Sequence, residues 1–242
     1  MDSGAETVAS DPLRRKTLRY HSKGLGVTLD LDLPGALHVL LDQLLAGWKT
    51  SEPSGDPQPD ITVRQSETFS LSSRFYTSGK NYADIVSMLN EILVALAYAV
   101  RHSVTGSALI HAAGHELGGS TQVTFGARKA GKSVLTARLA AQGARIWADD
   151  LLLWIPKLKV FKGLGISPRL RRPVLPDIVE TLPDNAFLAG EFTCYIRARS
   201  INLAAAGTVL KPDRVVELQK NQTLKEISWL KVGAEIERHR IP

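Results

Sequence analysis

One stretch decides how this chain is interpreted: Thr121-Gln122-Val123-Thr124-Phe125-Gly126-Ala127-Arg128-Lys129-Ala130-Gly131-Lys132-Ser133. Its last eight residues have the form G-x-x-x-x-G-K-[ST], the pattern of a phosphate-binding loop. Glycines let the backbone curl so that successive N–H groups face one anion, and a following helix adds its positive N-terminal end. Residues 121–125 predict the strand before such a loop, and residues 132–142 predict the helix after it, with Gly143 as its C-terminal cap.

The loop predicts a nucleotide site made by all eight of its residues: Gly126, Ala127, Arg128, Lys129, Ala130, Gly131, Lys132 and Ser133. A lysine in this place neutralises β- and γ-phosphates, and the hydroxyl of a following serine binds Mg²⁺. The predicted ligands are therefore ATP and Mg²⁺, although no motif separates ATP from GTP. A Gly-Lys turn that binds no nucleotide is the alternative.

Two neighbouring carboxylates, Asp149 and Asp150, end the next predicted strand, residues 145–148. Adjacent residues on a strand point to opposite sides, so we expect different roles for them. One would bind Mg²⁺, and the other would accept the proton of an attacking hydroxyl as general base. The sequence does not assign these two roles, and a solvated Asp-Asp turn is the alternative.

A histidine, His111, lies in the apolar run 109–113, which predicts a strand beside the strand of the phosphate-binding loop. An imidazole there would hydrogen-bond one aspartate and adjust its basicity, whereas a buried structural histidine is the alternative. His115 falls in a polar break, residues 115–120, where Gly118-Gly119 predicts a hairpin turn. We therefore expect His115 to be solvated.

The composition is that of an ordinary globular protein, with 242 residues, 44% hydrophobic and 22% charged. The net charge of +6 permits acidic partners, but no nucleic-acid motif is present. The single cysteine, Cys194, fits a reducing cytosol and a buried packing role. The N-terminus lacks the apolar segment of a signal peptide, and the apolar stretch 85–100 is interrupted by Asn90 and Glu91. We expect a cytoplasmic protein without a membrane segment.

The order of predicted elements gives an α/β fold with three parts: a disordered N-terminus (1–15), a small α+β lobe (16–105) and a nucleotide-binding core (106–242). The lobe is expected to hold strands at 17–20, 26–31, 61–63 and 69–76, with helices at 34–48 and 84–102. In the core, residues 160–175 are expected to loop over the nucleotide, with a strand at 209–218 and a helix within 224–240. The basic stretch 167–173 would clamp a phosphate or carboxylate, or form a solvated loop.

The spacing of these motifs resembles the catalytic domain of bacterial HPr kinase/phosphorylase, whose core is similar to that of phosphoenolpyruvate carboxykinase. His111 precedes Gly126 by fifteen residues, and the aspartate pair begins seventeen residues after Lys132, both as in that family. The resemblance implies that Lys132 and Ser133 bind phosphate and Mg²⁺, that Asp149 and Asp150 serve as metal ligand and base, and that His111 assists the base. It also implies assembly into homo-oligomers.

The resemblance covers residues 108–156 and weakens beyond them. Gly163-Leu164-Gly165-Ile166 matches part of a family signature, but Val160 stands where the family has a metal-binding glutamate. This leaves a phosphorolysis activity undecided. The chain looks more like the shorter relatives, some of which are linked to ribosomal peptide maturation, such as lasso-peptide tailoring kinases.

The expected activity is transfer of the γ-phosphoryl group of ATP to a hydroxyl, in particular that of a serine in a small protein or peptide, with a ribosomal peptide precursor among the partners considered. Two alternatives stay open. One is a catalytically degraded scaffold that binds ATP and a partner protein. The other is a kinase of a small molecule such as an amino acid.

Overall fold

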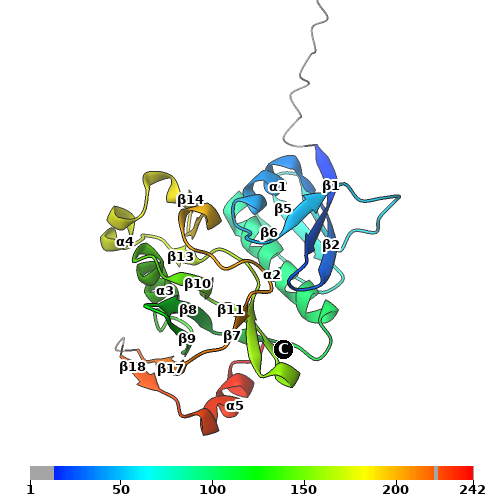
Figure 1. The fold of residues 1–242 in the computed structure, drawn as a ribbon. Coiled ribbons are helices and arrows are strands. Elements are labelled where there is room, and N and C mark those ends of the chain that lie inside the picture. Colours follow the sequence, from blue (N-terminus) through cyan, green and yellow to red (C-terminus); the bar gives the residue numbers. More distant parts are fainter. Residues whose placement is uncertain (1–13, 221–222, 242) are drawn as a thin grey trace, which may run out of the picture.

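A computed structural model describes residues 14–220 and 223–241, which form a mixed α/β fold with several sheets and few helices (Figure 1). This confirms the α/β class predicted from the sequence. Most of the residues predicted to be disordered lie outside the described part, and the first described strand, β1, already begins at Arg15.

The N-terminal half forms a six-stranded sheet in the order β3-β1-β2-β4-β5-β6. Its strands are β1 (Arg15–Ser22), β2 (Val27–Pro34), β3 (Lys49–Ser51), β4 (Ile61–Gln65), β5 (Phe69–Ser73) and β6 (Asn81–Tyr82), and its helices are α1 (Gly35–Asp42) and α2 (Ile85–Ser103). The predicted strands at 17–20 and 26–31 form the antiparallel pair β1–β2, in which alternate side chains of β2 are buried.

Two predicted elements of this half are shorter than expected. The helix predicted to reach residue 48 ends at Asp42, because the chain after it pairs with the other half of the molecule. Leu45 forms a bridge with Ile166, and the N–H of Ala46 donates to the carbonyl of Gly165 at 2.8 Å. The strand predicted for 69–76 ends at Ser73.

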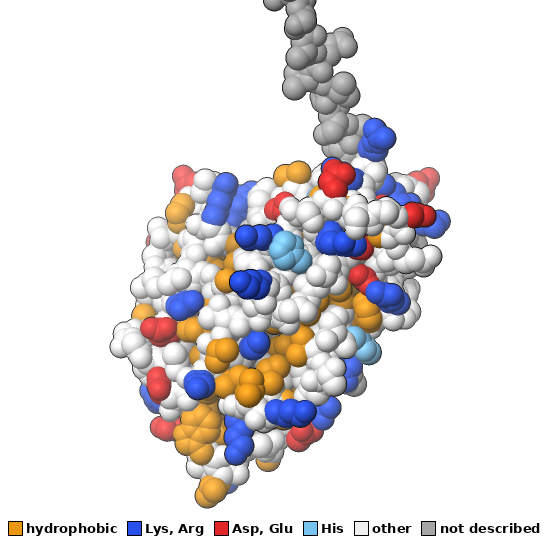
Figure 2. All heavy atoms as spheres, turned by 45° about the vertical axis from the view of Figure 1, so that its right-hand side comes forward, with side chains coloured by type: hydrophobic (Ala, Val, Ile, Leu, Met, Phe, Trp, Pro, Cys, Tyr) orange, Lys and Arg blue, Asp and Glu red, His pale blue; other side chains and the backbone are white. Residues whose placement is uncertain are grey.

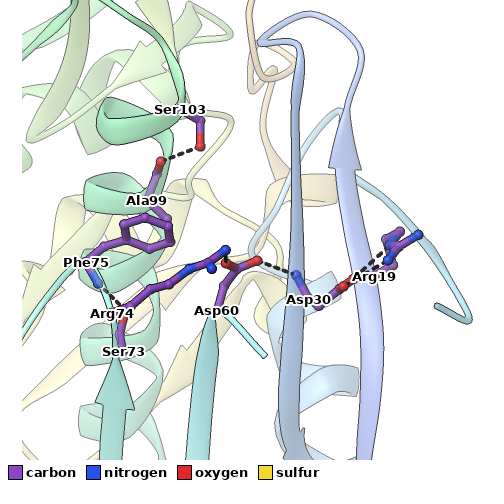
Figure 3. Close-up of polar contacts among 8 residues, drawn as sticks. All are labelled: Arg19, Asp30, Asp60, Ser73, Arg74, Phe75, Ala99 and Ser103. Carbon is purple, nitrogen blue, oxygen red and sulfur yellow. Dashed lines mark hydrogen bonds and ion pairs between the residues drawn. The ribbon is translucent and has the colours of Figure 1, made fainter. Parts of the chain in front are cut away.

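A buried carboxylate, that of Asp60, joins three neighbouring strands of this sheet (Figure 3). It accepts a hydrogen bond from the backbone N–H of Asp30 on β2 at 2.9 Å, and it forms an ion pair with Arg74, which follows β5. The side chain of Asp30 is in turn bound by the guanidinium of Arg19 on β1 at 2.8 and 2.9 Å. These bonds compensate the buried charge of the Asp60 carboxylate at the start of β4, the strand that pairs in parallel with β2.

The long helix α2 is the central apolar element of the fold, and it lies between the N-terminal sheet and the remaining strands (Figure 1). Asp84 caps it by accepting the N–H groups of Val86 and Ser87. Its 19 residues have the length and composition of a membrane-crossing helix, so our expectation that this stretch is too short and polar is wrong on that criterion. Its packing inside the core accounts for the same apolar composition, with buried residues Val86, Met88, Leu89, Glu91, Ile92, Leu93, Ala95, Leu96, Ala97, Ala99 and Val100.

The second half builds a five-stranded sheet (order β10-β8-β9-β17-β18), a four-stranded sheet (β16-β12-β11-β7) and a three-stranded sheet (β13-β15-β14). The strands are β7 (Ala108–His111), β8 (Ala113–Leu117), β9 (Ser120–Phe125), β10 (Arg145–Ala148), β11 (Leu151–Ile155), β12 (Val160–Gly163), β13 (Arg169–Arg171), β14 (Phe187–Ala189), β15 (Thr193–Ile196), β16 (Val209–Leu210), β17 (Arg214–Leu218) and β18 (Leu224–Glu226). The helices are α3 (Lys132–Ala141), α4 (Pro176–Thr181) and α5 (Trp229–Arg238), with short 3₁₀ turns at Pro156–Leu158, Asp184–Ala186 and Ala198–Ser200.

Several predictions for this half are corrected. Residues 160–175 contain two strands, β12 and β13, where a loop over the nucleotide was expected. The single strand predicted for 209–218 is divided into β16 and β17, which belong to different sheets. The tail helix predicted within 224–240 is confirmed as α5, which begins at Trp229 after the short strand β18. Gly118-Gly119 does form the predicted hairpin turn, with positive φ angles of 61° and 81°.

Two neighbouring segments pass from the five-stranded to the four-stranded sheet side by side. The first runs from β8 back to β7 through Ala112, and the second runs from β10 to β11 through Asp149-Asp150. Gly114 pairs with Ala148 on one side of this crossing, and His111 pairs with Leu151 on the other. The N–H of Ala112 donates to the carbonyl of Asp150 at 3.0 Å between them. The crossing therefore leaves the two aspartates outside regular strand pairing.

The two halves share a core, and the domain boundary near residue 105 stays a prediction. The largest buried cluster combines α1, α2 and the N-terminal strands with Leu109, Leu153, Leu164 and Tyr195 of the second half.

Figure 2 shows hydrophobic side chains gathered on the lower part of one face, with Lys and Arg side chains around them. Trp229 and Leu230 at the start of α5 are among the most exposed apolar side chains, at 59% and 98%.

Candidate functional site

The predicted phosphate-binding loop connects β9 to α3, so the strand and the helix that the motif requires are both present. Gly126 and Gly131 have φ angles of 155° and 103°, and Lys129 also has a positive φ of 67°. A Cβ atom on Gly126 would lie 2.8 Å from the carbonyl oxygen of Leu218, at the end of the parallel neighbour β17. Only glycine fits there without movement of the backbone.

The N-terminus of α3 offers its N–H groups without competition from a side chain. Gly131 occupies the N-cap position, no side chain forms a hydrogen bond to this cap, and the first turn holds no acidic residue. Free N–H groups at a helix start carry a partial positive charge and bind anions. The exposed side chains of Arg128 and Lys129 add positive charge beside them.

The loop lysine is buried and reaches back across the loop. Lys132 is 5% exposed, and its Nζ atom donates to the carbonyl oxygens of Gly126 at 2.7 Å and Ala127 at 3.4 Å. The same atom lies 2.9 Å from Nε2 of His111. Burial lowers the pKa of Lys132, and the charges of Asp150 and Asp149 oppose that shift in part.

His111 connects this lysine to the aspartate pair. A lysine ammonium has only donors, so Nε2 of His111 accepts its hydrogen bond and the ring proton is on Nδ1. Nδ1 lies 2.8 Å from Oδ1 of Asp150. The structure therefore contains a continuous chain of contacts from Lys132 through the His111 imidazole to the Asp150 carboxylate.

The strand that carries His111 lies in a different place from the one predicted. We expected it beside the phosphate-loop strand, but β7 pairs with β11 in the four-stranded sheet, and β8 is the strand beside β9. The expectation was wrong because the chain crosses between sheets at Ala112, which a continuous apolar run does not reveal. His111 reaches Asp150 and Lys132 because it lies at that crossing.

Asp149 has other partners than Asp150, although the two lie together in the bend between β10 and β11. It is 6% exposed, and its Oδ2 accepts the backbone N–H of Arg169 at 3.1 Å. Burial and the nearby charge of Asp150 raise the pKa of Asp149 to about 6, while the Arg169 N–H and charge and the Ser133 hydroxyl lower it in part. Ser133 of the loop is thus a direct neighbour of Asp149.

Asp150 has the opposite electrostatic character. Burial alone would raise its pKa, but the His111 hydrogen bond and the charges of Arg169 and Lys132 together hold the pKa of Asp150 below its usual value. Asp150 is therefore ionised at neutral pH, whereas Asp149 exchanges a proton nearer to neutrality. The two carboxylates that the sequence could not separate differ in their partners and in the direction of their pKa shifts.

Of the basic stretch at 167–173, one arginine belongs to the site. The Arg169 guanidinium binds Oδ1 of Asn90 on α2, and Tyr195 donates its hydroxyl to the same oxygen at 3.2 Å. Arg171 and Arg172 are exposed. Because Arg169–Arg171 forms strand β13, the stretch is not a solvated loop throughout, and a phosphate or carboxylate clamp stays a prediction.

A pocket opens beside the two aspartates, toward the N-terminal half. Its lining comes from α2, from the segment before β13, from β15 and from the β10–β11 crossing, and consists of Asn90, Leu93, Val94, Trp147, Ala148, Asp149, Asp150, Leu151, Leu164, Ile166, Ser167, Arg169 and Tyr195. The hydroxyl of Ser167, 1% exposed, has no hydrogen-bond partner among the described residues. A buried polar group without a partner is unusual and calls for an explanation.

The sequence analysis missed three residues of this site, and it misplaced His115, which does not line the pocket. Asn90 was visible as a polar residue in an apolar helix, but Tyr195 carries no local signal. His239 contributes through the tail: its carbonyl accepts the N–H of His111 at 2.9 Å, and its ring stacks on Phe125 at 5.1 Å. His115, expected to be solvated, is instead 5% exposed on β8.

The sequence matches no family model and no curated protein. The resemblance inferred from motif spacing therefore stays a prediction, and the function must be argued from the residues themselves.

Proposed function

We propose that this chain is an ATP-dependent kinase of the HPr-kinase-like type, with a P-loop core similar to that of phosphoenolpyruvate carboxykinase. It transfers the γ-phosphoryl group to a hydroxyl, that of a serine in a small protein or peptide. The observation that carries the proposal is the contact chain from Lys132 through His111 to Asp150, because it joins the predicted phosphate loop to a carboxylate that is ionised at neutral pH.

The nucleotide part of the proposal rests on the loop. The positive φ angles, the close approach of Gly126 to the Leu218 carbonyl and the open N-terminus of α3 give a concave backbone that a side chain would fill. ATP bound there would place its phosphates beside Lys132. We infer that Lys132 exchanges its bonds to the Gly126 carbonyl and His111 for bonds to phosphate oxygens.

The donor set also fits Mg²⁺. No group of three His, Cys, Asp or Glu side chains able to hold a metal occurs in residues 14–220 and 223–241. Mg²⁺ is usually held by one or two carboxylates together with substrate phosphates, so such a group is not required. We assign the ion to the Ser133 hydroxyl and Asp149, which are neighbours; when bound, it neutralises charge on the phosphates.

This leaves Asp150 as the general base. The acceptor hydroxyl approaches Asp150, which takes its proton as the new oxygen–phosphorus bond forms and the bond to the β-phosphate oxygen breaks. The Nδ1–H of His111 holds the carboxylate in place, and the charges of Arg169 and Lys132 keep it ionised. His111 is thus a positioning residue in this proposal.

One observation favours a second candidate, a scaffold that binds ATP without catalysis. Val160, which stands where the resembling family has a metal-binding glutamate, is 3% exposed at the start of β12 and offers no metal ligand. A kinase of a free amino acid remains the third candidate. The partners and the cytoplasmic location rest on the sequence argument alone.

Transfer of label from γ-labelled ATP tests the proposal. Asp150→Asn should abolish transfer to serine-containing acceptors, with a loss of about 10²- to 10⁴-fold, while ATP affinity stays within about twofold. Lys132→Ala should weaken ATP binding itself. The exposed Asp56→Asn is the matched control and should behave as the parent. ATP binding without any transfer by the parent would favour the scaffold, and unchanged ATP affinity in Lys132→Ala would refute the nucleotide site.

A further inference from the structure

We infer that the pocket between α2 and the aspartate pair is the acceptor site, and that it takes a seryl unit: a hydroxymethyl group next to a carbonyl or carboxylate. This inference rests on the proposed function and adds the place and chemistry of the acceptor. The pocket was not expected from the sequence, because its walls come from segments far apart in the chain.

The position of the pocket beside the aspartate pair supports its assignment as the acceptor site. Asp149 and Asp150 both line it. Asp149 also has Ser133 of the loop as a neighbour, so the pocket and the phosphate-binding loop adjoin at the aspartate pair. Phosphoryl transfer needs the acceptor oxygen next to both the base and the γ-phosphorus, and the two sites meet at this border.

The chemistry of the walls selects a short polar group. Leu93, Val94 and Ile166 provide apolar surface that suits a methylene group. Ser167 adds a buried hydroxyl without a partner, and the Arg169 guanidinium has N–H groups beyond the one bound to Asn90. These groups would bind a carbonyl or carboxylate oxygen beside the hydroxyl.

The Asn90 side chain fixes one wall. Its Oδ1 accepts from both Arg169 and the Tyr195 hydroxyl, so it holds these two side chains in defined places. Because Asn90 belongs to α2, the N-terminal half of the chain takes part in acceptor selection. This gives that half a function beyond packing.

The test uses γ-labelled ATP with two probes, free L-serine and N-acetyl-L-serinamide, and with N-acetyl-L-alaninamide as the probe without a hydroxyl. The variants are Val94→Trp, which fills the pocket, and Asn90→Ala, which removes the anchor of its wall. Val39→Trp places the same bulk on an exposed valine of α1, 62% exposed, and is the matched control. The dissociation constant for ATP is measured for every variant and reports both folding and the nucleotide site.

We expect the parent to label at least one seryl probe and not the alanine probe. Val94→Trp and Asn90→Ala should each lower transfer by about tenfold or more, with ATP affinity within about twofold of the parent, and Val39→Trp should leave both unchanged. Labelling of free serine alone identifies a small-molecule acceptor, and labelling of the blocked serinamide identifies a peptide acceptor.

The outcomes against the inference differ from those against the proposed function. Transfer that both pocket variants leave unchanged would place the acceptor elsewhere, with the kinase assignment intact. ATP binding without label on either seryl probe would refute the seryl assignment. Failure of the parent to bind ATP would overturn the proposed function and this inference with it.

Discussion

The buried histidine His115 gives the most quantitative prediction: protonating it should destabilise the fold. Nε2 of His115 lies 3.2 Å from Nε2 of Gln122, an amide nitrogen that can only donate, and Nδ1 is buried without a partner among the described residues. Burial lowers the pKa of His115 from 6.5 to about 4. A proton added to this ring would therefore enter a site with no acceptor for it.

The size and the sign of the stability change with pH follow from the difference in proton binding between the unfolded and the folded chain. Between about pH 6.5 and pH 4 the unfolded chain binds a proton at His115 and the folded chain does not, so stability falls as the pH falls through this range. A shift of about 2.5 pKa units corresponds to about 3 kcal/mol. Asp149 acts in the opposite direction, because its raised pKa of about 6 lets the folded chain bind the extra proton. The pH dependence of the parent alone is thus not informative.

A difference measurement separates the two groups. His115→Gln keeps an acceptor for Gln122 but cannot titrate, so urea unfolding of parent and variant should diverge by about 3 kcal/mol between pH 7 and pH 4, with the parent losing stability relative to the variant. His102→Gln, at an exposed histidine of α2, is the control for the same chemical change. A parent–variant difference that stays constant within about 1 kcal/mol over this range would refute the buried, neutral state of His115.

Three further predictions concern the site and its supports. His111→Asn should slow transfer by about 10²-fold and move the acid limb of the pH–rate profile to higher pH, because the His111 hydrogen bond lowers the pKa of Asp150. Steady-state rates measured against pH test this, and an acid limb that does not move would exclude the positioning role. Asp84→Ala should cost about 1 kcal/mol in urea unfolding through loss of the α2 cap, and an unchanged midpoint would show that the cap contributes nothing. Deleting residues 239–242 removes two hydrogen bonds of 2.9 Å, from the His111 N–H to the His239 carbonyl and from the Ile241 N–H to the Leu109 carbonyl. The deletion should lower the free energy of unfolding by about 1–3 kcal/mol and reduce label incorporation. Full activity would show that this tail does not hold His111.

Local sequence signals predicted the elements that are stabilised locally. α2 begins after its Asp84 cap, α3 is followed by Gly143 with a φ of 85°, and the Gly118-Gly119 hairpin forms where the turn residues indicate it. These signals depend on residues within a few positions of each other. They do not depend on which strands later pair.

The failures have a common physical cause in long-range pairing. His115 looks polar in sequence, yet its strand is inserted between β9 and β10, which buries it. The helix after Pro34 stops early because Leu45 pairs with Ile166, over a hundred residues away. Tyr195 joins the site through an equally distant contact with Asn90. No periodicity within a short window carries such information.

The crossing between the two sheets brings His111 and Asp150 into contact. Because the segments at Ala112 and Asp149-Asp150 cross side by side, strand pairing before and after them fixes which residues meet. One residue inserted between His111 and Gly114 would shift His111 relative to Leu151 and turn its side chain to the other face. The pairing at the crossing thus fixes the short spacing from His111 to Gly114, whereas the intervals of fifteen and seventeen residues also span the β8–β9 hairpin and α3, whose lengths the crossing does not set.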